Sequence, residues 1–129
     1  MRQTILLVSA DLYHAHPIQN CLAEAGFRVL TSELGERALD IIRLKKPGLV
    51  VLDWKLPDLS GLAIIRVIRS DERISKLPIV LVGGQMRDED RLIAFETGAD
   101  LCLAETFQPK VFIARVRALL RRAYSPELA

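Results

Sequence analysis

The stretch Pro47-Gly48-Leu49-Val50-Val51-Leu52-Asp53-Trp54-Lys55-Leu56-Pro57 decides the fold of this chain. Four apolar residues, 49–52, run without alternation into the carboxylate of Asp53, and a proline lies near each end. A continuous apolar run between turn residues is typical of a strand buried on both faces, as in a parallel sheet. Because sites in open α/β sheets form at the carboxyl ends of strands, we expect Asp53 to lie at the candidate site.

Further short apolar runs alternate with amphipathic segments on both sides of this stretch. We predict the other strands at 4–8, 27–30, 78–82 and 101–103. Such alternation predicts an α/β fold with a five-stranded parallel sheet and five helices on both faces. The flavodoxin-like strand order 2-1-3-4-5 is the best single prediction for five such units.

Two of the expected helices have notable features. Pro17 is tolerated only in the first turn of a helix, so the first helix is expected either to start near His16 or to have an unusual entry. The fourth helix begins at the acidic residues 88–90, where the helix dipole favours negative charge. Its predicted apolar side consists of Leu92, Ile93 and Phe95.

Length and composition limit the class of protein. A chain of 129 residues, half of them hydrophobic and 26% charged, fits one globular domain. No apolar run approaches the roughly 20 residues that span a bilayer, and no signal-peptide pattern precedes the first strand, so we predict a cytoplasmic location. The net charge of +2 is too small to indicate nucleic-acid binding. Two cysteines, Cys21 and Cys102, are too few for a disulfide framework and are expected to be buried thiols.

Several motifs occur together in a fixed order. They are Asp53 at a strand end, Leu56-Pro57-Asp58-Leu59-Ser60-Gly61 after it, Pro78 before the fourth strand, and Glu96-Thr97-Gly98-Ala99-Asp100. With these motifs the chain resembles the receiver domain of two-component response regulators over essentially its whole length. Leu119-Leu120-Arg121-Arg122, followed by a Ser-Pro pair, is most similar to the OmpR/PhoB type. The resemblance implies a receiver domain over 1–123 and a linker or tail at 124–129, leading to a DNA-binding domain that the sequence does not contain.

In this family an aspartate at the position of Asp53 accepts a phosphoryl group from a histidine kinase. The resemblance implies that Mg²⁺ is held by this aspartate and by an acidic pair after the first strand. It also implies a hydroxyl after the fourth strand and a lysine after the fifth, both contacting phosphoryl oxygens. These requirements follow from the chemistry, because Mg²⁺ takes oxygen ligands and phosphoryl transfer is catalysed by positioning and charge neutralisation.

This chain departs from the family pattern at nearly every working position. Ser9 and Ala10 replace the acidic pair, with Asp11 one position later. Gly83 replaces the hydroxyl, Cys102 the aromatic residue of the fifth strand, and Glu105, before Thr106, the lysine. We therefore expect phosphorylation of Asp53 to be weak or absent, and the chain not to be an enzyme. No cofactor is expected to be required, and any Mg²⁺ bound by Asp53 and Asp11 should be bound weakly.

The resemblance also implies a homodimer through the fourth helix, fifth strand and fifth helix, with charged pairs across the face. The candidate residues are Arg91, Glu96, Asp100, Leu101, Val111, Arg115, Arg117 and Arg122. Leu101 and Val111 stand where acidic residues are usual, so the contact is expected to be more hydrophobic. Other expected partners are a histidine kinase and, only through the absent domain, nucleic acid.

The preferred interpretation is thus an atypical receiver that regulates transcription by protein interaction and dimerisation. The alternative is a working phosphoacceptor at Asp53, in which Asp11 and Glu105 would replace the usual metal ligands. Weaker hypotheses are a ligand-switched module, for which the sequence offers no constellation of residues, and a metal site at His14 and His16. Two residues at i and i+2 do not share a helix face, which speaks against that metal site.

Overall fold

The computed structural model describes residues 3–104 and 108–124 of the chain, with the side chains of 12–14 left aside. Strands and helices alternate along it in the order β1 Thr4–Val8, α1 Leu12–Glu24, β2 Arg28–Ser32, α2 Gly35–Lys45, β3 Leu49–Asp53, α3 Gly61–Ser70, β4 Ile79–Val82, α4 Asp88–Thr97, β5 Leu101–Leu103 and α5 Pro109–Tyr124. The five strands form one parallel sheet in the order β2-β1-β3-β4-β5. The predicted fold class and strand order are confirmed.

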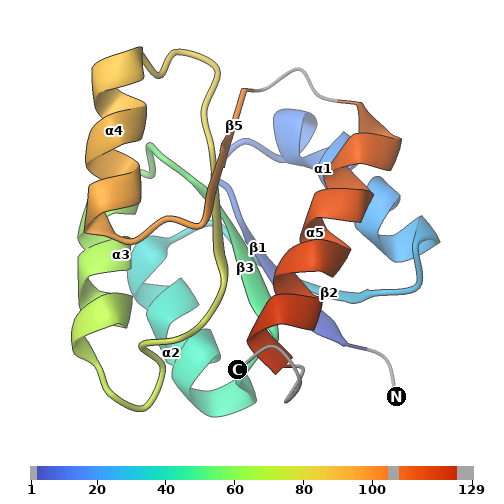
Figure 1. Cartoon of the computed structure of the whole chain (residues 1–129), viewed down its shortest axis with the longest axis horizontal. Helices are drawn as coiled ribbons and strands as arrows, with labels where there is room; N and C mark the ends of the chain where they lie inside the picture. The colour runs from blue at the N-terminus through green and yellow to red at the C-terminus, as the bar shows by residue number, and fades with distance from the viewer. Residues whose placement is uncertain (1–2, 105–107, 125–129) are drawn as a thin grey trace.

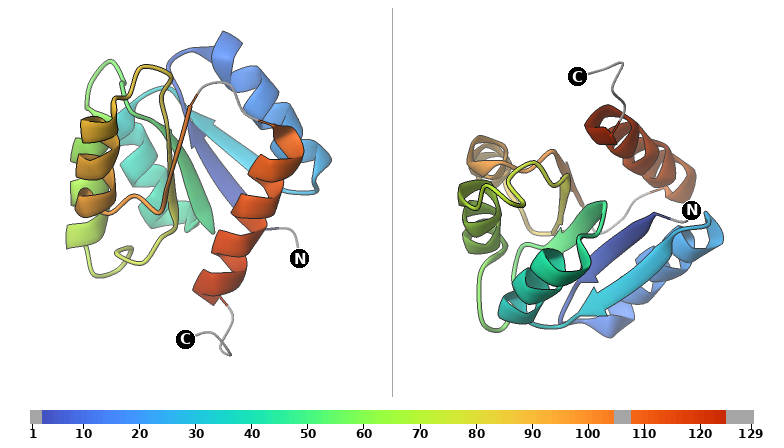
Figure 2. Two further views of the ribbon diagram at one scale, coloured as in Figure 1. Left: turned by 45° about the horizontal axis from the view of Figure 1, so that its top comes forward. Right: turned by 90° about the horizontal axis from the view of Figure 1, so that it is seen from below.

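The central strands are buried on both faces, and their side chains alternate between two cores. In β3, Val50 and Leu52 join the core under α2, α3 and α4, whereas Leu49 and Val51 join the core under α1 and α5. Figure 1 shows these two groups of helices on opposite sides of the sheet, and the left view of Figure 2 shows the same separation. This two-residue period fixes which strand residues face the candidate site.

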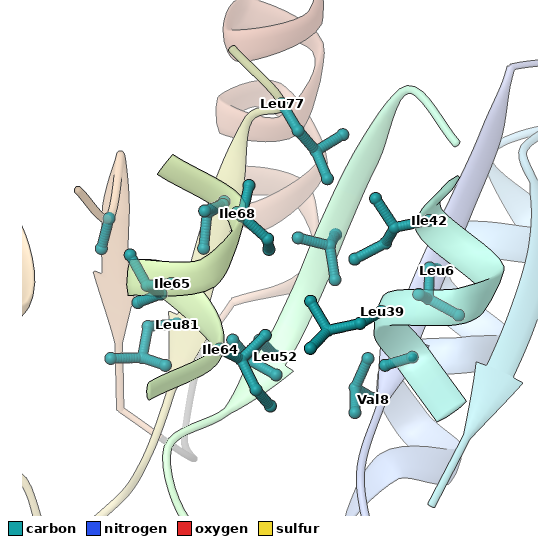
Figure 3. Close-up of a cluster of buried hydrophobic side chains, with 14 of the residues drawn as sticks. Leu6, Val8, Leu39, Ile42, Leu52, Ile64, Ile65, Ile68, Leu77 and Leu81 are labelled. Atoms are coloured by element: carbon teal, nitrogen blue, oxygen red, sulfur yellow. The ribbon is translucent and has the colours of Figure 1, made fainter. Parts of the chain in front are cut away.

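The core under α2, α3 and α4 is built from aliphatic side chains, as Figure 3 shows. Ile64, Ile65 and Ile68 of α3 are fully buried, and each such burial stabilises the fold by about 1.5–3 kcal/mol. The hydroxyl of Ser60 caps α3 by accepting a hydrogen bond from the backbone N–H of Ala63 at 3.1 Å. α3 is therefore held firmly beside the end of β3.

The loop between β3 and α3 is tied to α2. The two carboxylate oxygens of Asp58 accept hydrogen bonds from the backbone N–H groups of Gly35 (2.8 Å) and Glu36 (3.0 Å). These bonds stabilise the charged form and hold the pKa of Asp58 below its usual value. Asp58 thus caps the first turn of α2, where no side chain of α2 itself does so.

Three local expectations need correction or refinement. β2 runs from Arg28 to Ser32 rather than over 27–30, because pairing with β1 continues until the backbone N–H of Ser9 donates to the carbonyl of Ser32. α1 begins at Leu12 and contains Pro17 in its interior, so the expectation that Pro17 lies in the first turn of a helix starting near His16 is wrong. α5 continues through Tyr124, whose hydroxyl donates to the carbonyl oxygen of Gly48 at 2.7 Å.

The predicted apolar side of α4 is wrong. Leu92, Ile93 and Phe95 are 59%, 44% and 48% exposed, and the buried residue of this helix is Ala94. A small side chain allows α4 to lie close to the core, so the larger apolar side chains remain on the outer surface. In the part of the chain that the structure describes, no helix is both long and apolar enough to cross a membrane.

Candidate functional site

Ser9 and Asp53 meet at the carboxyl edge of the sheet. Ser9 directly follows β1, Asp53 ends β3, and these strands are neighbours. Leu7 and Val51 face α1 and α5, so the residues two positions later face the same side. The hydroxyl of Ser9 donates a hydrogen bond to Oδ2 of Asp53 at 2.6 Å. The residue that replaces the first member of the acidic pair is therefore a direct partner of the expected phosphoacceptor.

The same hydroxyl orders the loop after β1. Ser9 is only 5% exposed, and its Oγ accepts a hydrogen bond from the backbone N–H of Asp11 at 3.2 Å. Ala10 is exposed and brings no polar side chain to the edge. A buried hydroxyl that both donates and accepts in this way holds a fixed position.

The position expected to carry a hydroxyl is filled by a neighbouring side chain. Gly83 is buried, and a Cβ atom built on it would lie 2.7 Å from Cδ1 of Trp54 and 3.4 Å from Cγ of Met86. The indole of Trp54 therefore packs directly on the Gly83 backbone, where any larger residue would place its side chain. This contact was not predicted from the sequence, and the only available signal was a large aromatic residue next to Asp53 combined with a glycine after β4.

Lys55 lies over the same indole. Its Nζ is 5.7 Å from the centre of the Trp54 ring, within the range of a cation–π contact. The backbone of the loop after Trp54 is also held in place, because Lys55 forms an isolated antiparallel bridge with Ser60. The exposed ammonium group of Lys55 is thus associated with Trp54 beside the Asp53 carboxylate.

A cavity of about 230 Å³ opens beside Asp53. Its lining residues come from β1, α1, β3 and β4 and from the segments that follow these three strands: Leu7, Ser9, Asp11, Ala15, Ile18, Asp53, Trp54, Lys55, Val82, Gly83, Gly84 and Gln85. The two predicted carboxylates, Asp11 and Asp53, therefore share one cavity. The third predicted carboxylate, Glu105, and its neighbour Thr106 lie outside the described residues.

These donors fit a Mg²⁺ centre poorly. Mg²⁺ requires near-octahedral oxygen ligation and is usually anchored by one or two carboxylates. Here Oδ2 of Asp53 already accepts the short bond from Ser9, whose neutral hydroxyl stands in place of a charged ligand. Among the residues that the structure describes, no three His, Cys, Asp or Glu side chains are grouped closely enough to hold a metal.

Two other predicted residues lie away from the cavity. Cys102 is half-buried against the core under α2, α3 and α4, and this burial raises the pKa of its thiol. His16 is exposed, with its Nδ1 3.2 Å from the side-chain amide of Asn20, and the side chain of His14 lies outside the described ones. Neither position contributes to the site at Asp53.

The candidate dimer face is only partly available for charged pairs. Asp100 forms an ion pair with Arg69 at 3.0 Å, and its carboxylate also accepts from the backbone N–H of Ile79. Arg91 lies 3.6 Å from Asp88 within α4. The remaining charged candidates, Glu96, Arg115, Arg117 and Arg122, are exposed.

The two apolar residues predicted for the dimer face differ in exposure, and the basic residue Arg117 lies away from this face. Val111 is 46% exposed, whereas Leu101 is half-buried within β5. Arg117 donates to the carbonyl of Ala25 at 3.3 Å, so it lies toward α1. The apolar surface of α4 (Leu92, Ile93 and Phe95) was missed, because the sequence pattern placed it in the core.

Comparison with known proteins identifies the family to which the chain belongs. The response regulator receiver domain family matches residues 5–117. Among curated proteins, the transcriptional regulatory protein GltR of Pseudomonas aeruginosa is 36% identical over 94% of this chain and 50% of its own length. The DNA-binding response regulator MtrA of Mycobacterium tuberculosis is 38% identical over 95% of this chain and 52% of its own length. The chain spans about half the length of the curated relatives it matches.

Solved structures of response regulators have the same fold as this chain. The beryllofluoride-activated N-terminal receiver domain of RstA from Klebsiella pneumoniae has a TM-score of 0.85 at 31% identity, covering 92% of this chain and 99% of that one. A two-component response regulator from Clostridium difficile has a TM-score of 0.86 at 27% identity, covering 96% and 100%. The chain belongs to the response regulator receiver domain family.

Proposed function

We propose that this receiver domain acts as a regulatory interaction module in which phosphorylation of Asp53 is weak or absent. The observation that carries the proposal is the 2.6 Å hydrogen bond from Ser9 to Asp53, at a position where the family's chemistry needs a second carboxylate. A neutral hydroxyl provides no negative charge for Mg²⁺, and it occupies an oxygen of the acceptor. Loss of the metal removes most of the charge neutralisation on which phosphoryl transfer depends.

The surroundings of Gly83 support the same proposal. A hydroxyl-bearing residue there would have to displace the indole of Trp54, since even a Cβ would approach it to 2.7 Å. Lys55 is the one cation among the described residues lining the cavity, and its ammonium lies over Trp54. The described part of the site therefore offers little to stabilise a phosphoryl group.

The output is proposed to be control of transcription through a DNA-binding domain. The MtrA relatives are named as DNA-binding response regulators, and this chain corresponds to about half of their length. We propose that two copies associate through α4, β5 and α5, with the exposed apolar side chains of α4 and Val111 in the contact. Exposed apolar patches of this kind are typical of interaction sites.

Phosphorylation is tested by incubating the chain with acetyl phosphate and Mg²⁺ and measuring its intact mass. The expected result is no addition of a phosphoryl group to the unmodified protein. The Asp53→Ala variant serves as the control for modification at other sites. A stoichiometric mass increase that is absent from Asp53→Ala would overturn the proposal.

Self-association is tested by sedimentation of the chain over a wide concentration range. We expect a monomer–dimer equilibrium that Arg115→Glu on α5 weakens, because this substitution reverses the charge at the proposed contact. Arg37→Glu on α2 is the matched control, since it makes the same charge change on the other side of the sheet. A monomer at all concentrations, or equal effects of the two substitutions, would show that the face is wrong.

A second candidate function is a working phosphoacceptor at Asp53. The observation that favours it is the shared cavity, in which the carboxylates of Asp11 and Asp53 both line a space of about 230 Å³. In that case Asp11 would have to serve as the second metal ligand. The acetyl phosphate experiment distinguishes the candidates, and loss of modification in Asp11→Asn would identify this ligand.

A further inference from the structure

The small net charge of +2 conceals a separation of charge between the two edges of the sheet. Acids gather at the carboxyl edge, where Glu36 and residues 88–90 lie in the first turns of α2 and α4. Asp11 and Asp53 add two carboxylates at the same edge. Cations gather at the amino edge, where both α2 and α5 end in a basic last turn.

Three hollows adjoin one another at the amino edge around Tyr124, the last residue of α5. Figure 1 shows this end of α5 near the end of α2, and Lys46 lines two of the hollows together with Tyr124. The charged residues that line the three hollows, here called the basic pole, are Lys46, Glu72, Arg73, Lys76, Arg117 and Arg121. Five cations thus accompany a single carboxylate among the described lining residues.

Most cations of the basic pole are available to an outside anion. Lys46, Lys76 and Arg121 are exposed, and none of them forms an ion pair with another described residue. Arg117 is also exposed and donates to the neutral carbonyl of Ala25, so its positive charge is not offset. Four positive charges at the pole are therefore not neutralised by the part of the chain that the structure describes.

The pole is held in place by contacts that leave it charged. The carboxylate of Asp71 pairs with both Arg43 (3.2 Å) and Arg73 (3.0 Å), so that one anion is shared by two cations. The hydroxyl of Tyr124 donates to the carbonyl of Gly48 at 2.7 Å and joins the end of α5 to the start of β3. The cations of α5 and of the segment after α2 are thus presented on a fixed surface.

Lys46 has a backbone conformation that lysine rarely adopts. Its φ of 48° and ψ of 60° lie in the left-handed region, and no other described residue except glycine has a positive φ. Glycine commonly takes this position at the end of a helix, because it lacks the Cβ that makes the conformation costly. A lysine here keeps a cation at the pole at a cost in stability, and such strain is typical of functional sites.

We propose that the basic pole binds the phosphate backbone of duplex DNA without reading its sequence. Exposed lysine and arginine side chains gathered on one surface are the electrostatic footprint of backbone contacts. The inference rests on the proposed control of transcription, because a receiver that acts through a DNA-binding domain works next to a duplex. Contacts from the pole would add to the affinity of that domain and would orient the receiver on the DNA.

The test measures binding of the chain to a short fluorescent duplex by anisotropy over a series of salt concentrations. With three to four phosphates neutralised, a plot of log affinity against log salt concentration should have a slope of about −3 to −4. Affinity should therefore fall by about a hundredfold between about 50 and 200 mM salt. A second duplex of unrelated sequence should bind equally well. No binding at the lowest salt concentration, or a marked preference for one sequence, would overturn the proposal.

Two double variants that remove the same charge locate the contact. Lys46→Gln combined with Arg121→Gln neutralises part of the pole, so it should weaken binding at low salt by at least about tenfold and make the slope shallower by about 2. Arg37→Gln combined with Lys110→Gln is the matched control, because both residues are exposed in first turns at the carboxyl edge. This control should leave the affinity within about twofold, because salt screens distant charges. Equal weakening by the two double variants would show a response to net charge alone and refute the assignment.

A further variant separates binding from stability. Lys46→Gly relieves the left-handed conformation, so it should raise the melting temperature and at the same time weaken duplex binding. The alternative role of Lys46 is to offset the negative end of the α2 dipole. A lower melting temperature with unchanged duplex binding would assign Lys46 to that role and overturn its place in the contact.

Another anionic partner and failure of the proposed function are distinguished by separate measurements. Binding to vesicles that contain about 30% phosphatidylserine, without binding to the duplex, would assign the pole to a membrane surface and overturn the proposal. The acetyl phosphate and sedimentation experiments contain no DNA. A chain that resists phosphorylation and dimerises but does not bind the duplex would overturn this inference alone. Duplex binding by a chain that is phosphorylated on Asp53 would overturn the proposed function alone.

Discussion

Substitution of Gly83 by alanine tests how the site is filled. The added Cβ would lie 2.7 Å from Cδ1 and 3.1 Å from Cγ of the Trp54 indole. Carbon atoms attract each other best at about 3.5–4.0 Å, so the ring must withdraw by about 1 Å. The neighbouring Met86 is only 6% exposed and leaves little room for this movement.

Two opposing effects set the change in the free energy of unfolding that Gly83→Ala should cause. Overpacking of a filled region costs typically about 1–3 kcal/mol. Replacing a glycine whose backbone suits alanine stabilises by about 0.4–1 kcal/mol, and Gly83 is not among the glycines with positive φ. Gly83→Ala should therefore lower the free energy of unfolding by about 1–2 kcal/mol.

The assay is urea unfolding followed by circular dichroism, which remains usable when Trp54 is replaced. In a Trp54→Ala background the clash is absent, so Gly83→Ala should change sign and stabilise by about 0.4–1 kcal/mol. Gly84→Ala is the control, because Gly84 is exposed and also lacks a positive φ. If Gly83→Ala has the same effect in both backgrounds, Trp54 does not occupy this space and the reasoning fails.

Three further predictions concern contacts that support the fold. The pKa of Asp71 is lowered from 3.8 to about 2, chiefly by the side-chain hydrogen bonds from Arg73, so Asp71→Asn should destabilise at neutral pH. A depressed pKa gives stability that is lost as pH falls, so the difference in the free energy of unfolding between the variant and the unmodified protein should decrease between pH 3.8 and about 2. A difference that stays constant over this range in urea unfolding would exclude this mechanism. Arg69→Ala should cost about 2–4 kcal/mol in urea unfolding, because the guanidinium donates to three backbone carbonyls and an aspartate; a loss below about 1 kcal/mol would refute this. Tyr124→Phe removes the 2.7 Å hydrogen bond to the carbonyl of Gly48 and should lower the free energy of unfolding by about 0.5–1.5 kcal/mol, which is measured as a lower melting temperature. An unchanged melting temperature would show that this bond does not stabilise α5.

The alternation of strands and helices followed from sequence periodicity, whereas the confirmed strand order was the best single prediction for a sheet of five such units. The run 49–52 ending in Asp53 is a central buried strand, and the alternation of apolar and amphipathic segments predicted the other four strands. The same two-residue period places Ser9 and Asp53 on one face of adjacent strands. The contact between them could have been predicted by counting positions from the ends of β1 and β3.

Other parts of the site depend on tertiary packing that no local pattern specifies. Trp54 lies on Gly83 because this residue, 29 positions further along the chain, lacks a side chain. The guanidinium of Arg69 joins α3 to the carbonyls of Ser75, Leu77 and Gly98, and these three carbonyls come together only in the folded chain. Helical periodicity also cannot distinguish a core from a partner surface.

α4 shows this last limit clearly. Its apolar residues have helical spacing, yet the helix is packed through Ala94 and exposes Leu92 and Phe95. A helix with a short buried side chain and larger outward ones has the composition of an interaction surface. The error in the sequence prediction thus identifies the surface on which the proposed dimer depends.

The most direct test of the central claim is a titration of the chain with beryllofluoride in the presence of Mg²⁺. The readouts are the emission of Trp54, which packs beside the Asp53 strand end, and the sedimentation coefficient. A domain in which Ser9 and Gly83 have replaced the family's working groups should show no saturable, Mg²⁺-dependent change in either quantity. A saturable change that requires Mg²⁺ and disappears in Asp53→Ala would contradict the account.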